Sequence, residues 1–116
     1  MKKIFYLSTC STCSKIINSF KDCKDYELRE IKSKPITEIE LDAMKDLAGS
    51  YEALFSRRAM KYKALGLKDK NLNEADFKKY ILEEYTFLKR PVVLADNEIF
   101  VGNSKKVVEQ MQAHFS

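Results

Sequence analysis

The sequence has few of the residues that interrupt regular structure: among 116 residues there are three glycines, two prolines and no tryptophan. So few glycines and prolines argue against a disordered or low-complexity chain, and the length suits one domain with one hydrophobic core. No apolar run approaches the roughly 20 residues that span a bilayer. The apolar run after Lys2 and Lys3 is also shorter than the about 7–15 residues of a secretory signal. We therefore expect a cytoplasmic protein with no membrane partner.

A strong charge of one sign and a set of metal ligands are also missing. The net charge is only +4, and the lysines are scattered along the chain rather than gathered on one stripe, as nucleic-acid binding would favour. The single histidine, His114, lies far from the cysteines, and there is no second C-x-x-C, whereas a structural zinc site needs four ligands. We therefore expect neither direct nucleic-acid binding nor a bound metal.

The first thirty residues have the pattern of a strand, a helix and a second strand. The apolar run 4–7 is typical of a strand buried on both faces, and the small polar residues of 8–14 favour a helix start. Apolar side chains then recur at helical spacing, at Cys13, Ile16, Ile17 and Phe20. Alternation from Tyr26 to about Ile31 predicts the second strand. The segment thus reads as a βαβ unit with a right-handed crossover.

The middle of the chain, about residues 37–88, is expected to be helical. Thr37 and Glu40 have the spacing of a capping box, Ile36 can pack on Leu41, and Gly49 is a stop signal. Short helices are expected from Ser50 to Phe55 and from Arg58 to Leu65. A longer helix capped by Asn73 would carry an apolar face of Phe77, Tyr80, Ile81 and Leu88.

The remaining segment predicts a β-hairpin and a last helix. Residues 92–95 and 98–101 are β-prone, and Asp96-Asn97 between them tolerates the positive φ of a two-residue turn. A helix follows, with Val107, Val108 and Met111 on one face. We therefore predict an α/β fold with a four-stranded mixed sheet, β-α-β then β-β-α, as one domain over 1–116 with a helical insertion at about 37–88.

The chemistry of the sequence centres on the pair Cys10 and Cys13. Cys10 falls where the first strand meets the first helix, and the N–H groups and partial positive charge of a helix start favour a thiolate. Cys13 lies about one helical turn further on, so its sulfur can reach Cys10 and the pair can form a disulfide. A C-x-x-C beside a βαβ pattern in a cytosolic protein indicates redox chemistry. Two buried cysteines at this spacing are the alternative, which the surrounding serines and threonines disfavour.

A second feature is Arg90-Pro91, directly before the hairpin. Proline is tolerated at the first residue of a strand, and a cis bond there would be a specific structural feature. Arg90 can direct its guanidinium at an anion or at the Cys10 thiolate. An arginine that merely flanks an edge strand is the alternative. For Cys23 and His114 we expect structural roles. For Lys15, in the first turns of the helix that follows Cys10, electrostatic support of the thiolate and a solvated position stay open as alternatives.

Four motifs in this order resemble the arsenate reductase (ArsC)/Spx family over essentially the whole chain. They are Cys10-Ser11-Thr12-Cys13, the stretch from Ser56 to Leu67, Lys89-Arg90-Pro91-Val92, and Val101-Gly102-Asn103. The resemblance implies a thioredoxin-like, glutaredoxin-related fold, a cis peptide before Pro91 and a reactive Cys10. It also implies that Arg58, next to Arg57, and Arg90 are the arginines of the family site.

The resemblance leaves two kinds of function open. Family arsenate reductases use glutathione or glutaredoxin and three arginines, but no arginine stands near Val101-Gly102, and each charge-assisted bond contributes about 1.5–3 kcal/mol. We therefore expect a thiol–disulfide oxidoreductase acting on a thiol or oxyanion substrate. It would bind no cofactor, with glutathione as co-substrate and glutaredoxin or thioredoxin as reducing partners. The alternative is an Spx-like redox regulator that binds the C-terminal domain of the RNA polymerase α subunit.

Overall fold

The computed structural model describes all residues from Met1 to Ser116, which divide into two compact units. Unit 1 combines Met1–Lys34 with Arg90–Ser116, and unit 2 is Pro35–Lys89. The segment expected as a helical insertion at about 37–88 thus lies within unit 2. None of the helices has both the length and the apolar character required to cross a membrane.

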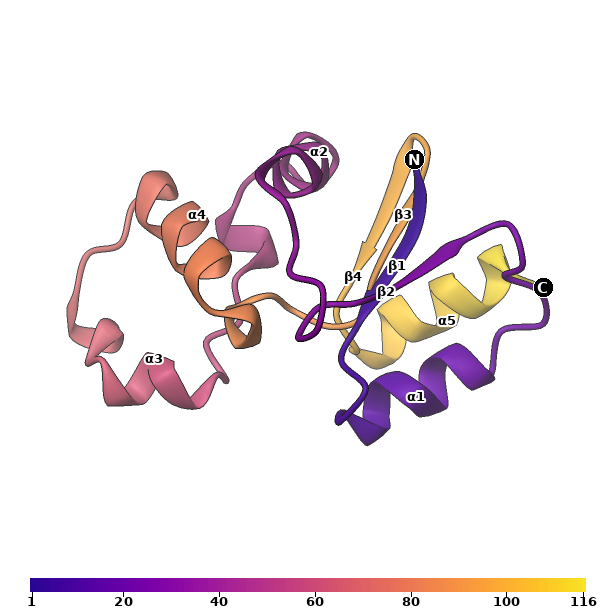
Figure 1. The fold of residues 1–116 in the computed structure, drawn as a ribbon, viewed down its shortest axis with the longest axis horizontal. Coiled ribbons are helices and arrows are strands. Elements are labelled where there is room, and N and C mark those ends of the chain that lie inside the picture. The colour runs from indigo at the N-terminus through magenta and orange to yellow at the C-terminus, as the bar shows by residue number, and fades with distance from the viewer. The chain divides into compact units, whose positions relative to one another are not determined.

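Unit 1 contains a four-stranded sheet in the order β2-β1-β3-β4 (Figure 1). The strands are β1 (Lys2–Tyr6), β2 (Glu27–Glu30), β3 (Val92–Ala95) and β4 (Glu98–Val101). β1 pairs in parallel with β2 and antiparallel with β3, while β3 and β4 are antiparallel. Ile4 and Phe5 point to opposite faces and are both fully buried, as expected for a strand without a solvent-exposed face. The mixed sheet predicted from the sequence is confirmed.

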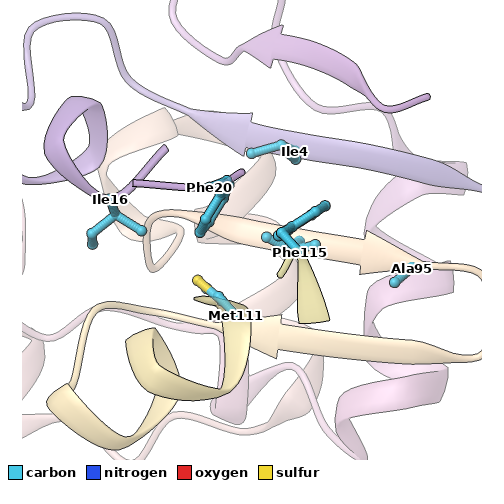
Figure 2. Packing of buried hydrophobic residues seen from close by; sticks show 7 residues of the cluster. Ile4, Ile16, Phe20, Ala95, Met111 and Phe115 are labelled. Carbon is cyan, nitrogen blue, oxygen red and sulfur yellow. The ribbon is translucent and has the colours of Figure 1, made fainter. Parts of the chain in front are cut away.

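Two helices of unit 1, α1 (Ser11–Asn18) and α5 (Lys105–His114), lie side by side along the sheet (Figure 1). Figure 2 shows the core in which their side chains meet those of the strands. Its buried members are Ile4, Ile16, Phe20, Val93, Ala95, Met111 and Phe115. Phe20 follows the end of α1 and stacks on Phe115 with ring centroids 4.4 Å apart. This apolar core anchors α1, the helix that carries the two cysteines.

The predicted hairpin and its turn are confirmed. Asp96 has a φ of 57°, the left-handed conformation that asparagine and aspartate accept more readily than other non-glycine residues. The Asp96 carboxylate also pairs with the Met1 ammonium group at 2.9 Å. The last helix begins where expected, because the Ser104 hydroxyl accepts a hydrogen bond from the Val107 N–H.

Unit 2 is helical, as the sequence indicated. Its elements are α2 (Glu38–Ala48), α3 (Met60–Ala64), α4 (Glu74–Glu83) and the short 3-10 helices η1 (Glu52–Leu54), η2 (Leu67–Asp69) and η3 (Tyr85–Phe87). The capping box of Thr37 and Glu40 is present, and Gly49 ends α2 with a φ of 98°. Asn73 caps α4 and forms a second capping box with Asp76.

Two details of the helical prediction are wrong. Leu88 is not on the Asn73-capped helix, because Glu84 is extended and ends α4; Leu88 instead bridges to Phe55 as an isolated antiparallel pair. The helix expected from Arg58 begins only at Met60, so Arg58 lies in the preceding turn. Spacing alone could not reveal the break at Glu84, because the apolar pattern continues across it.

Candidate active site

Cys10 lies between β1 and α1, at the N-cap position of the helix. The Cys10 N–H donates to the Leu7 carbonyl at 3.0 Å, which closes a turn from Leu7 to Cys10. The Cys10 carbonyl accepts the first helical hydrogen bond, from the Ser14 N–H at 3.2 Å. The side chain is partly exposed. The structure therefore places this thiol at a helix start and within reach of solvent, where the sequence placed it.

Several groups around Cys10 favour its ionised form. Partial burial acts to raise the pKa of the thiol, but the N–H and side chain of Cys13, the charge of Arg90 and the N–H of Thr12 together lower the pKa below its usual value. A thiol with a lowered pKa is more fully ionised at neutral pH, and only the thiolate is an effective nucleophile. Cys10 thus has the electrostatic environment of a reactive cysteine.

Cys13 has the opposite environment one turn further along α1. Its side chain is fully buried, and this burial raises the pKa to about 11; the neighbouring Cys10 sulfur adds to the effect. All three cysteines are free thiols in this structure. The pair therefore consists of one accessible sulfur prone to ionise and one shielded sulfur that holds its proton and can donate it toward the first.

Arg90 and Pro91 join unit 1 at the start of β3. The Arg90-Pro91 peptide bond is cis, as the family resemblance implied. The Pro91 carbonyl accepts from the Gly102 N–H at 2.9 Å, and the Arg90 carbonyl accepts from the Asn103 side-chain amide at 3.1 Å. The charge of Arg90 lowers the pKa of both cysteines. The structure thus brings Cys10, Cys13, Arg90 and Pro91 into one unit and joins Arg90 electrostatically to the thiols.

Arg58 belongs to unit 2 and lies exposed in the turn before α3. Its neighbour Arg57 is already engaged: it pairs with Glu52 at 2.8 Å and lies over the Phe77 ring, 5.6 Å from the centroid. Of the two adjacent arginines, Arg58 is therefore the one whose side chain is available to a ligand. Its participation in the thiol site stays a prediction.

Glu30 is a feature near the site that the sequence reasoning missed. Its carboxylate accepts a hydrogen bond from the N–H of Ser8, in the turn that precedes Cys10. The residue type alone gave no signal, because Glu30 reads as one polar position of an alternating strand. Only the parallel register, which pairs Tyr6 with Glu30, shows that Glu30 ends its strand next to the turn from Leu7 to Cys10.

The residues for which we expected no catalytic role lie outside this arrangement. Cys23 is partly buried and packs against the unit 1 core. His114 lies near the end of α5, where its Nε2 is 2.8 Å from the Tyr26 hydroxyl. No group of three or more His, Cys, Asp or Glu side chains is arranged to hold a metal ion.

A sheet of this topology, with a C-x-x-C at the first helix and a cis-proline at the third strand, defines a thioredoxin-like protein. The chain belongs to the ArsC family, whose model matches residues 5–111. A search of curated protein sequences found no match.

Solved structures of similar fold cover nearly the whole chain. An ArsC-family-related protein from Bacteroides fragilis is 25% identical with a TM-score of 0.75, over 95% of this chain and 96% of that one. An arsenate reductase from Vibrio cholerae is 16% identical with a TM-score of 0.75, over 99% and 97%. A YffB protein is 17% identical with a TM-score of 0.80, over 100% of both chains. These structures support the thioredoxin-like fold.

Proposed function

We propose that the protein is a thiol–disulfide oxidoreductase in which Cys10 attacks the substrate and Cys13 resolves the intermediate. The observation that carries this proposal is the contrast between the two sulfurs: the accessible one has a lowered pKa, and the buried one has a raised pKa. Such a difference assigns the nucleophile before any substrate is bound, because the Cys10 thiol loses its proton more readily than the Cys13 thiol, and only the thiolate attacks.

In the first step the Cys10 thiolate attacks one sulfur of a substrate disulfide. A new bond forms between that sulfur and the Cys10 Sγ, the substrate S–S bond breaks, and the other sulfur leaves as a thiolate. The charge of Arg90 stabilises the attacking thiolate beforehand. The product of this step is a mixed disulfide between the substrate and Cys10.

In the second step Cys13 attacks the Cys10 sulfur. A Cys10–Cys13 bond forms as the bond between the Cys10 Sγ and the substrate sulfur breaks, and the Cys13 proton passes to the departing substrate thiolate or to water. Over the two steps the substrate disulfide is reduced by two electrons to two thiols. The loss of the Cys10 charge in the mixed disulfide assists this step, because that charge raises the pKa of Cys13. Glutathione, glutaredoxin or thioredoxin would then return the pair to the dithiol form. We place this cycle in the cytoplasm, where thiols are kept reduced.

We favour a disulfide over arsenate as the substrate. Arg90, together with Arg58, would stabilise the thiolate or an anionic group of the substrate, such as a carboxylate of glutathione. The third arginine of family arsenate reductases has no counterpart here, because Val101 is followed by Gly102 and Asn103. No cofactor needs to be bound for the exchange, since every electron is carried by sulfur.

The test is the reduction of a glutathione mixed disulfide, with glutathione and arsenate assayed in parallel. We expect turnover to be abolished in Cys10→Ser, to be slowed in Cys13→Ser, and to stay at the wild-type rate in Cys23→Ser, the matched control. Unchanged turnover in Cys10→Ser would overturn the proposal.

The alternative is that the same pair acts as a redox switch in an Spx-like regulator of RNA polymerase. The observation in its favour is that two free thiols stand at C-x-x-C spacing, which suits a reversible disulfide, while the arginine set of the family reductases is incomplete. In that case the C-terminal domain of the polymerase α subunit would bind one redox form of the protein better than the other. Pull-downs with the reduced and oxidised protein distinguish the two functions, because an oxidoreductase would not retain this domain in either form.

A further inference from the structure

We propose that Glu30 is a positioning residue for the nucleophile: its carboxylate fixes the turn that holds Cys10 at the start of α1. The inference rests on the proposed function, because it concerns how the reactive thiol is held in place. It assigns a role to an acidic side chain that does not touch the substrate.

The parallel pairing of β1 and β2 brings Glu30 to this turn. Carboxyl ends of parallel strands meet at one edge of a sheet, and the register pairs Tyr6 with Glu30, the last residues of their strands. The last backbone hydrogen bond between the two segments is donated by the Ile31 N–H to the Tyr6 carbonyl at 3.0 Å. Beyond it, the segments that follow β1 and β2 separate. The Glu30 side chain spans this point of separation.

Both oxygens of the Glu30 carboxylate accept hydrogen bonds, and they do so from two different turns. Oε2 accepts from the Ser8 N–H at 2.9 Å, within the turn from Leu7 to Cys10. Oε1 accepts from the N–H of Lys32 at 3.0 Å and from the N–H and hydroxyl of Ser33 at 2.7 and 2.9 Å. The turn after β2 therefore anchors the carboxylate, and the anchored carboxylate holds the turn before Cys10.

This attachment matters for Cys10 because the groups that favour its thiolate are directional. The N–H groups of Thr12 and Cys13 stabilise the Cys10 sulfur only while Cys10 keeps its N-cap geometry. The N–H groups of Ser8 and Ser33, together with the side chains of both residues, lower the pKa of Glu30 to about 2, so the carboxylate is ionised throughout the pH range in which thiols titrate.

Positioning and simple electrostatics predict opposite effects when the Glu30 charge is removed. A negative charge acting only through space raises the pKa of a nearby thiol, so removing it would lower the pKa of Cys10. If Glu30 acts by holding the turn, removing it loosens the Cys10 geometry and raises the pKa instead. Glu30→Gln separates the two effects: it keeps the size of the side chain, but an amide has only one oxygen and cannot accept hydrogen bonds from both turns.

The experiment measures the rate of alkylation of Cys10 by iodoacetamide against pH, followed on the Cys10 peptide by mass spectrometry. In Glu30→Gln we expect the midpoint to rise by at least ~0.5 pH unit, which lowers the rate below the midpoint about threefold. Glu27→Gln is the matched control, because Glu27 lies on the same strand and its charge pairs with Arg29 at 3.5 Å. The control should keep the wild-type midpoint. An unchanged or lowered midpoint in Glu30→Gln would overturn the inference.

A second variant guards against general loss of structure. Ser33→Ala removes one donor to Oε1 and leaves Glu30 and the Cys10 turn in place, so it should raise the midpoint in the same direction by a smaller amount. Combined with Glu30→Gln it should add nothing further, because both act through one carboxylate. If the Cys10 alkylation midpoint of the wild-type protein equals that of a free cysteine, the proposed function is refuted. That outcome differs from the one that refutes the role of Glu30, so the two can be distinguished.

Discussion

At the scale of single residues, the two cysteines of the C-x-x-C show how position decides chemistry. Cys10 and Cys13 are the same residue type, yet their pKa values move in opposite directions, because one lies partly exposed at a helix start and the other is buried in the first turn. Each sulfur also affects the other: the Cys13 thiol donates toward Cys10, and the Cys10 charge disfavours ionisation of Cys13. The site is therefore a coupled pair.

The first prediction tests this coupling. In Cys13→Ala the donor to the Cys10 thiolate is lost, so the pKa of Cys10 should rise relative to the wild type. Ultraviolet absorbance of the thiolate against pH measures the shift, and Cys23→Ala should leave the Cys10 titration in place. A Cys10 titration that did not move in Cys13→Ala would mean that the N–H groups and Arg90 suffice.

The second prediction concerns acid stability at Glu30. Its pKa is about 2 in the folded protein, below the about 4.3 of a free glutamate, so the stability it contributes is present above the unfolded value and is lost as the pH falls toward the folded value. Urea unfolding should show Glu30→Gln less stable than the wild type at neutral pH. The difference should shrink as the pH falls from about 4.5 to about 2. A constant difference across this range would contradict the assignment.

At the scale of elements, a helix start was predicted well where a side chain at the N-cap accepts a hydrogen bond from the first turn of the helix. Thr37 with Glu40 and Asn73 with Asp76 both form reciprocal capping boxes, which satisfy N–H groups that a helix start leaves open. The short helix α3 has no side-chain cap and no buried residue, and its start was misplaced from the sequence by two residues. The two helix starts with capping boxes were therefore readable from the sequence, whereas the uncapped start of α3 was not.

The third prediction tests the cap of α2. Thr37→Ala removes the oxygen that accepts from the Glu40 N–H at 3.1 Å and should lower the free energy of unfolding by about 1 kcal/mol. Chemical denaturation measures the change. Asp46→Ala, an exposed substitution near the other end of the same helix, should cause no loss. Equal losses in both variants would show that the cap contributes nothing specific.

At the scale of the whole molecule, each of the two units has its own hydrophobic core, and the two cores are formed by different kinds of element. The core of unit 1 joins α1 and α5 to the sheet, and Met111 is one of its fully buried members (Figure 2). Unit 2 has an aromatic core in which the Phe55 ring meets those of Phe77 and Phe87 at centroid distances of 4.9 and 5.0 Å. The thiol pair depends on the first core, because α1 is packed there through Ile16.

The fourth prediction tests how much this core contributes to the stability of the protein. Met111→Ala should create a cavity and lower the free energy of unfolding by about 2–5 kcal/mol. Thermal and urea unfolding measure the loss, and the adjacent exposed variant Gln110→Ala should be close to the wild type. A loss below about 1 kcal/mol for Met111→Ala would mean that the core collapses around the missing side chain.

The fold could be predicted further than the site. The spacing of apolar residues predicted the strands and most helices, because an element that buries one face must place its apolar side chains at regular intervals along the sequence. The break at Glu84 was hidden, since the backbone can turn without a glycine or proline when the following apolar residues still find a core. Cys10 and Cys13 were visible through their spacing, but Glu30 was not, because its role depends on which strands pair and in what register.

The division of the chain has a consequence for how the protein is made. Unit 2 is one continuous stretch, whereas unit 1 needs the segment from Arg90 onward to complete its sheet. During synthesis from the N-terminus, β1 and α1 emerge first, but β3, the central neighbour of β1, leaves the ribosome only after all of unit 2. Cys10 and Cys13 therefore stay outside a finished core while unit 2 is synthesised, and a reducing environment or a chaperone would protect them during that interval.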